Sequence, residues 1–275
     1  MPDPSVPSHT LPPRQSQTGL PGQRWKWWHT AALALILAFF TWMAVWRPWS
    51  LYASWLVVVF ALVGFIVIAG LGVTGVWRGA FIDERNMISL SRFQMLVWTV
   101  LVLSSYGAIT ISRAQTDALT ALDVEVPHTL WILMGISTTS LVGSPLLKNT
   151  KKDPRLAMRP DDQVQALDSQ REGLAAHVRV EGRIVSRKSI EDARWSDLFI
   201  GEEVSNAAHL NLAKIQMFFF TVLVVLSYGV AVGSLLLSTP NADALPDVGE
   251  GMLALFGISH GGYLIDKAVP SAPGT

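Results

Sequence analysis

Six long apolar stretches dominate this sequence and decide which folds are open to it. A helix needs about 20 largely apolar residues to cross the hydrocarbon core of a bilayer. The sequence therefore predicts an all-α integral membrane protein with six transmembrane helices. The last stretch is the weakest, because His260 and several glycines interrupt it. The stretches cover residues 30–46, 51–77, 95–112, 130–147, 215–238 and 248–265.

Composition and charge argue against several classes of protein. Half of the 275 residues are apolar and only 15% are charged, which is unusual for a soluble domain. A net charge of zero argues against a nucleic-acid partner, since neutralising phosphates takes a basic excess. The chain has no cysteine, so it offers neither a thiol nucleophile nor a thiolate metal site. It also lacks a phosphate-binding loop and the common hydrolase motifs, so we expect no enzyme activity and no cofactor.

The polar segments between the apolar stretches indicate the domain organisation and the orientation. Residues 1–28 are rich in proline and predict a disordered tail, 29–78 a two-helix hairpin, and 269–275 a second short tail. Placing both termini in the cytoplasm leaves only Arg47 and Arg113, among 21 lysines and arginines, on the outer side. The excess of basic residues in inner loops therefore predicts cytoplasmic N- and C-termini.

One membrane-length phrase occurs twice. "SRFQMLVWTVLVLSSYG" at 91–107 matches "AKIQMFFFTVLVVLSYG" at 213–229, with nine of seventeen positions identical. At the same offset of 122 residues, "LWILMGIS" at 130–137 matches "MLALFGIS" at 252–259. The sequence thus predicts that a two-helix hairpin, residues 79–147, is repeated at 213–268. Corresponding helices of the two copies are two spans apart and so run in the same direction, which predicts a parallel repeat.

Most identical positions of the repeat fall on one side of a helix. At about 100° per residue, seven of the nine lie within an arc of about 160°. We interpret this arc as a packing face used in both copies, with lipid on the divergent side. Its polar members are Gln94, Thr99, Ser105 and Tyr106, which correspond to Gln216, Thr221, Ser227 and Tyr228; Met95, Leu101 and Val102 complete it.

Other polar residues of the predicted spans are candidates for a functional site. Ser137, Ser140 and Ser144 form a hydroxyl stripe, which can line water or allow close helix packing. His260, next to Ser259, is the ionisable side chain nearest to mid-span, and such residues are candidates for function. The last two candidates are Arg92 and Lys214, at the inner ends of the helices. We expect their side chains to extend to lipid phosphates.

The insertion between the two hairpins, residues 148–212, is polar. Its patterns predict a short helix in "QVQALDSQREGL", an alternating strand-like segment in "HVRVEGRIV" and a helix in "SIEDARWSDLFIGEE". It holds few large apolar side chains, so we expect it to pack on a protein partner or on the loop before the first repeat. Four acids precede the two repeats: Asp83, Glu84, Glu202 and Glu203. We expect them to be solvated and to neutralise Arg85, Arg92 and Lys214, with a shared cation site as the alternative.

Three phrases carry a resemblance to known proteins. "SLSRFQMLVWTV", "DLFIGEEVSN" and "GISHGGYL" resemble motifs of a family of uncharacterised bacterial multi-span membrane proteins built around this duplicated hairpin. The resemblance covers roughly residues 79–268. It implies a location in the bacterial inner membrane and brings no assigned activity.

Two functional hypotheses remain open. The first is a structural or interaction subunit that forms homo-oligomers and docks a cytoplasmic protein through residues 148–212. The second is a cation-conducting pore or a small-solute transporter. It would use the hydroxyl stripe, His260 and the acids of the outer loops, 113–129 and 239–250, which could concentrate cations.

Overall fold

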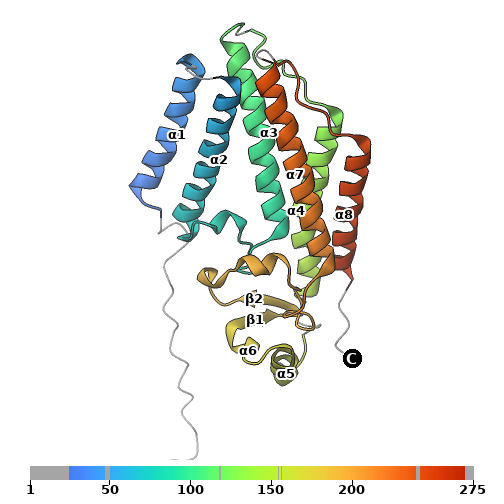
Figure 1. Cartoon of the computed structure of the whole chain (residues 1–275). Helices are drawn as coiled ribbons and strands as arrows, with labels where there is room; N and C mark the ends of the chain where they lie inside the picture. Colours follow the sequence, from blue (N-terminus) through green and yellow to red (C-terminus); the bar gives the residue numbers. More distant parts are fainter. Residues whose placement is uncertain are drawn as a thin grey trace, which may run out of the picture.

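The computed structural model describes residues 25–46, 50–117, 119–153, 155, 157–239 and 242–269. Six helices of 19 to 27 residues stand side by side, and the insertion lies beneath one end of this bundle (Figure 1). We call this end the insertion side. The helices are α1 (Trp27–Trp46), α2 (Leu51–Thr74), α3 (Leu90–Ala114), α4 (His128–Lys151), α7 (Leu212–Ser238) and α8 (Glu250–Ala268).

Four of these helices, α2, α3, α4 and α7, are long and apolar enough to cross a membrane. The other two expected spans are also helical, over 20 residues in α1 and 19 residues in α8. Residues 1–24 and 270–275, which hold most of the two expected tails, lie outside the described residues. The prediction of a disordered tail over residues 1–28 is wrong for residues 27 and 28, because α1 begins at Trp27.

The ends of the helices are set by residues whose side chains or backbones suit them. Ser50 precedes α2, and its Oγ accepts a hydrogen bond from the backbone N–H of Ala53 at 3.3 Å. Gly75 ends α2 in the left-handed region (φ 80°), where glycine carries no steric cost. Asn211 precedes α7 and accepts from the backbone N–H of Lys214 at 2.9 Å. Hydropathy alone predicted the start of α2 at residue 51, but it placed the end of α2 at residue 77 and the start of the fifth span at residue 215, because it does not register these caps.

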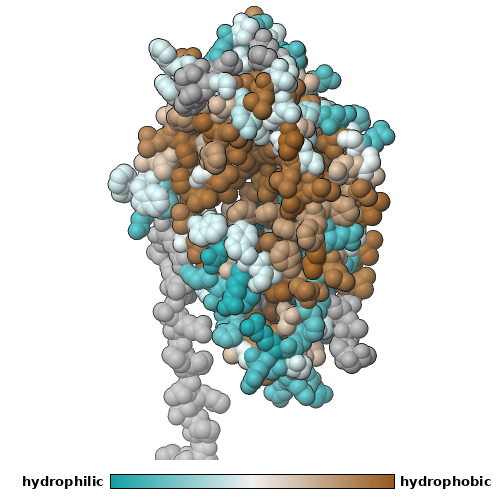
Figure 2. All heavy atoms as spheres, in the orientation of Figure 1, coloured by the Kyte–Doolittle hydropathy of each residue, from teal (hydrophilic) through white to brown (hydrophobic). Residues whose placement is uncertain are grey.

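Helix α3 lies at the centre of the bundle and packs against α2, α4 and α7, while α8 packs against α4 and α7. The main apolar core gathers around Trp98, which is 1% exposed and meets Phe256 of α8 edge to face, with ring centroids 6.1 Å apart. Side chains on the outer faces are apolar as well, including Phe60, Leu223 and Ile258 (Figure 2). A surface of this kind suits hydrocarbon rather than water.

The two copies of the repeated phrase do not bury the same face. Helix α3 buries Gln94, Trp98 and Leu101, whereas α7 buries Met217, Thr221 and Val224, which correspond to positions 95, 99 and 102. The buried face of α7 is thus shifted by one residue, which is about 100° around the helix. The difference follows from position, because α3 is surrounded by helices and α7 lies nearer the edge of the bundle.

The predicted shared packing face is therefore wrong at several positions. Thr99 and Gln216 are exposed, although their counterparts Thr221 and Gln94 are fully buried. A symmetric repeat would pair Gln94 with Thr221 and Gln216 with Thr99. Only the first of these two pairs forms, with Gln94 Nε2 donating to Thr221 Oγ1. The two sites are equivalent in sequence and different in environment.

This asymmetry predicts unequal effects of one substitution. Thr221→Leu enlarges a fully buried side chain and removes the partner of Gln94, so we expect it to cost about 1–3 kcal/mol of unfolding free energy. Thr99→Leu, on the exposed side of α3, is expected to change it by less than about 0.5 kcal/mol. Unfolding of the two variants in detergent, side by side, measures the difference. Equal losses would contradict the arrangement of α3 and α7.

The insertion forms a small module with its own core. It contains α5 (Pro160–Gln170), α6 (Leu174–His177), and an antiparallel hairpin of β1 (Val178–Glu181) and β2 (Ile184–Arg187). Gly182 makes the turn at φ 62°, and a Cβ there would lie 2.5 Å from the Lys151 carbonyl oxygen. The module's apolar cluster consists of Leu167, Val178, Val185, Val204 and Ala207.

The structure confirms the short helix and the strand-like segment, which form α5 and the β-hairpin. The helix expected in "SIEDARWSDLFIGEE" is wrong, because only two 3-10 turns form, at Ile190–Asp192 and Trp195–Leu198. The buried Asp197 explains the second turn. Its carboxylate accepts from the backbone N–H of Arg194 and pairs with Arg187, which ties the segment to β2 instead of a regular helix.

Candidate functional site

The loops that precede α3 and α7 meet at the insertion side of the bundle. We call residues 75–89 the first junction loop and residues 199–211 the second. In the first, Asn86 adopts a left-handed conformation (φ 56°) and donates from Nδ2 to the carbonyl oxygen of Arg187 in β2, at 3.1 Å. The backbone N–H of Arg187 donates in turn to the Arg85 carbonyl oxygen, at 2.9 Å. The module therefore packs on the first junction loop, one of the two surfaces predicted for it.

A carboxylate of the second junction loop is the centre of this region. Glu202 lies 2.9 Å from Lys214 Nζ of α7 and 3.1 Å from Lys267 Nζ of α8. Arg85 of the first junction loop approaches it to 3.3 Å and Lys148 of α4 to 3.9 Å. Four cations from four separate segments thus surround one acid. We call these five residues, together with Asp83, the junction cluster.

Asp83 completes the cluster from the first junction loop. Its carboxylate lies 3.0 Å from Arg85 Nη2 and 2.9 Å from Lys148 Nζ. None of the six side chains is more than 10% exposed. The cluster therefore sets four positive charges against two negative ones in a space that water hardly reaches.

The cations decide the ionisation of the two acids. Burial by itself raises a carboxyl pKa, but the nearby charges of Arg85 and Lys148 outweigh it and hold the pKa of Asp83 below its usual range. Burial likewise opposes ionisation of Glu202, yet Arg85, Lys148, Lys214 and Lys267 hold its pKa well below the usual value. Both acids are therefore carboxylates at neutral pH, and the expectation that they are solvated is wrong.

A second ion pair extends the junction toward the module. Lys151, at the end of α4, lies 2.6 Å from Glu203 and also donates to the carbonyl oxygen of Val269, at 2.9 Å. Arg183 of the β-hairpin turn reaches the same carboxylate at 3.3 Å. A cavity of about 20 Å³, large enough for about one water molecule, lies between these groups and the junction cluster.

Polar side chains continue from the cluster into the bundle. Lys267 Nζ donates to Ser144 Oγ and to Tyr263 OH, and the Tyr263 hydroxyl lies 3.3 Å from Ser91 Oγ. One turn deeper, His260 Nδ1 lies 2.6 Å from Ser140 Oγ, and its Nε2 lies 3.2 Å from Gln94 Nε2. These groups form a polar column that runs between α3, α4, α7 and α8.

The column ends beyond His260. Phe256 packs on the imidazole with ring centroids 4.1 Å apart, and Trp98 packs on Phe256. Several buried polar atoms in this part have no hydrogen-bond partner among the described residues: Gln94 Oε1, Trp98 Nε1, Ser137 Oγ, Tyr228 OH and Ser259 Oγ. The polar column is thus closed at this end by aromatic rings.

The structure brings together some of the predicted candidates and separates others. Gln94, Thr221, Ser140 and His260 meet in the column, and Ser144 contacts Lys267. Lys214 is buried in the junction cluster rather than reaching to lipid, because Glu202 and the Ile200 carbonyl oxygen bind its ammonium group. Three further candidates are buried near the closed end of the column: Ser137, Tyr228 and Ser259. The others lie apart: Arg92, Thr99 and Gln216 are exposed, and Tyr106 donates to the Leu122 carbonyl oxygen.

The predicted partners Arg85 and Lys214 do pair with the acids, whereas sequence reasoning missed Lys148 and Lys267. One signal pointed to Lys148: it lies four residues after Ser144, so the helix places it on the face of the predicted hydroxyl stripe. Lys151 extends the same face by one more turn, and both lysines are buried. The predicted hydroxyl stripe ends at Ser144, but the same face of α4 continues to the two lysines and so to the junction cluster.

Within the described residues, no group of three or more His, Asp and Glu side chains is placed to hold a metal ion. Comparisons with known proteins do not extend this description: no family model, no curated protein and no solved structure matches the chain. The resemblance of its hairpin motifs to bacterial multi-span proteins stays a prediction from the sequence.

Proposed function

We propose that this chain is an integral protein of the bacterial inner membrane, with six spans, cytoplasmic termini and a parallel repeat of the last two hairpins. Four helices of sufficient length and apolarity support the location, as do the apolar outer faces of the bundle. The orientation is supported by the basic residues, which gather at the insertion side. Helices α3 and α7 both start at that side, as a parallel repeat requires (Figure 1).

Its function, in this proposal, is that of an oligomeric structural or interaction subunit. The observation that carries it is the junction cluster, in which Glu202 joins four cations from both halves of the chain. Buried ion pairs contribute little net stability, and their best-attested role is to fix one arrangement. Here they fix the polar module against the bundle, as suits a protein that presents its insertion to a soluble partner.

The packing of the interior supports this function over a conduit. The polar column is closed by Trp98 and Phe256, which are both buried. Two cavities near the junction cluster have volumes of about 20 and 40 Å³, and the large one, of about 820 Å³, is lined by apolar side chains and opens sideways. A closed bundle of this kind would serve as a scaffold without moving any solute.

A pore or transporter is the second candidate, and the polar column is the observation that favours it. Hydroxyl groups without partners, such as those of Ser137 and Ser259, are costly in an apolar interior and would be satisfied by water in an open state. That state would require the rings of Trp98 and Phe256 to move apart.

One experiment separates the two candidates. The purified full chain is reconstituted into vesicles, its ion and proton flux is measured across a range of pH, voltage and salt, and its mass in detergent is determined. The interaction subunit is expected to be an oligomer with no flux above that of empty vesicles. Flux that His260→Leu abolishes would refute the subunit and establish the pore, while a monomer without flux would refute the proposed oligomer.

A further inference from the structure

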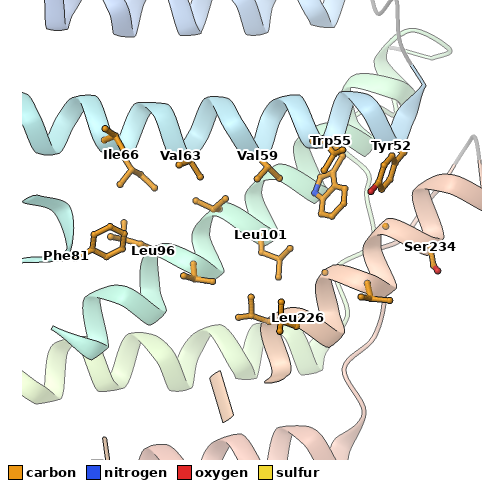
Figure 3. A pocket seen from close by; sticks show the side chains of 18 of the residues that line it. Tyr52, Trp55, Val59, Val63, Ile66, Phe81, Leu96, Leu101, Leu226 and Ser234 are labelled. Atoms are coloured by element: carbon orange, nitrogen blue, oxygen red, sulfur yellow. The ribbon is translucent and has the colours of Figure 1, made fainter. Parts of the chain in front are cut away.

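A large apolar groove opens on the side of the bundle, away from the junction cluster. It has a volume of about 820 Å³ and lies between α2, α3 and α7. Val59, Val63 and Ile66 of α2 point toward it, opposite Leu96 and Leu101 of α3 (Figure 3). Figure 2 shows apolar surface over this face of the bundle. None of the residues in the groove belongs to the polar column or to the junction cluster.

The groove is shaped by a close contact at one end. Gly233 of α7 lies under the ring of Tyr52, so that a Cβ there would be 3.4 Å from Tyr52 Cε2 and 3.6 Å from Trp55 Cζ3. Toward the insertion side, the space between α2 and α7 widens, with α3 as its floor (Figure 3). The side chains that line this wedge leave it open.

Aromatic rings border the other end, where the insertion meets the bundle. Trp195 of the module packs against Trp77 and Phe81, with ring centroids 5.9 and 5.7 Å apart. Trp77 and Trp195 are both partly exposed, which suits amphipathic rings at the boundary between hydrocarbon and headgroups. This end of the groove therefore lies where the polar part of a lipid would be.

Next to these rings lies a cation, Arg78, that has no counter-ion among the described residues. Arg78 follows Trp77, and its Nη2 donates to the carbonyl oxygen of Glu191 at 2.8 Å. The ion pairs formed among the described residues include no partner for this guanidinium. A half-buried arginine at this boundary is complementary to a phosphate group.

The dimensions of the groove favour a lipid chain over a helix. The lining residues of α2 run from Tyr52 to Val67, which is about 23 Å along a helix, so the mean cross-section of the groove is about 36 Å². A helix with its side chains is about 10 Å across and needs about 80 Å². The groove is therefore wide enough for extended hydrocarbon along its length, whereas another membrane helix would lie across its open side.

We propose that this groove is a binding site for a phospholipid, which lays an acyl chain between α2, α3 and α7 and places its phosphate at Arg78. The lipid would fill the wedge and join the helices of the bundle to Trp195 of the module. The site rests on the proposed membrane location and not on the interaction role. A chain that conducts ions and still retains the lipid would refute that role and leave the site intact.

The test uses the full chain, washed in detergent until free lipid is removed, with phosphatidylglycerol as the probe. Native mass spectrometry measures the lipid bound per chain and its dissociation constant. Val63→Trp fills the groove and is expected to abolish retention, whereas Val142→Trp, on an exposed face of α4 outside the groove, is expected to leave it unchanged. Equal retention by both variants overturns the proposal.

Arg78 supplies the second arm of this test. Arg78→Gln is expected to weaken phosphatidylglycerol binding by about tenfold, the scale of one charged hydrogen bond, and Arg78→Lys to restore most of it. Arg171→Gln, at an exposed position of the module outside the groove, is the matched control and is expected to have no effect. If Val63→Trp changes the oligomeric state and leaves bound lipid unaltered, the groove is a protein interface and the proposal is wrong.

Discussion

Glu202→Gln is expected to destabilise this protein more than any other single replacement of a polar side chain. The substitution keeps the size of the side chain and removes the charge that four cations share: Arg85, Lys148, Lys214 and Lys267. Removing one partner of a buried ion pair leaves uncompensated charge and costs about 3–5 kcal/mol. Thermal unfolding in detergent, followed by circular dichroism, measures the loss.

The same replacement at an exposed position is the control. Glu172, between α5 and α6, is exposed, so Glu172→Gln is expected to stay within about 0.5 kcal/mol of the unmodified chain. If the two variants unfold alike, then Glu202 does not hold the junction together, and the argument that the module is fixed in place loses its basis.

The pH dependence gives an independent check on Glu202. Because the folded state holds the pKa values of Asp83 and Glu202 below their usual range, their stabilisation is complete above the ordinary carboxyl pKa of about 4. It is lost as the pH falls through the lowered folded-state values. Glu202→Gln should therefore reduce the loss of stability on acidification and leave the part due to Asp83.

Trp98→Ala is the second large effect that we expect. Trp98 is 1% exposed and lies between Phe256 and Tyr228, with ring centroids 6.1 Å from each. Its removal leaves a cavity at the centre of the bundle, where neighbouring helices cannot close in, and costs about 3–5 kcal/mol. The variant should unfold in detergent at a lower temperature and at a lower denaturant concentration.

Trp131→Ala is the matched control for this cavity. Trp131 is 60% exposed on the outer face of α4, so its truncation opens no internal space and is expected to cost less than about 1 kcal/mol. A comparable loss in the two variants would mean that Trp98 does not fill the core. In the pore candidate, Trp98→Ala would also raise flux by opening the column, which the interaction subunit does not predict.

The helices and the β-hairpin are what the sequence by itself determined. Long apolar runs, the cap at Ser50 and the alternation on either side of Gly182 act over a few neighbouring residues, so no distant partner is needed to specify them. The repeated phrase likewise marks α3 and α7 as related segments before their surroundings are known. Their outlines follow from local physical chemistry.

The tertiary structure alone decided which faces are buried and which charges pair. Thr99 and Thr221 are identical residues in matching phrases, yet Thr99 is exposed and Thr221 is buried. The reason is that α3 and α7 have different neighbours and turn different faces toward them. Arg85 and Glu202 are 117 residues apart, and each looks like a solvated loop residue in its own segment. Only the folding of both junction loops against the ends of the helices removes water from them, and that exclusion turns six separate charges into one cluster.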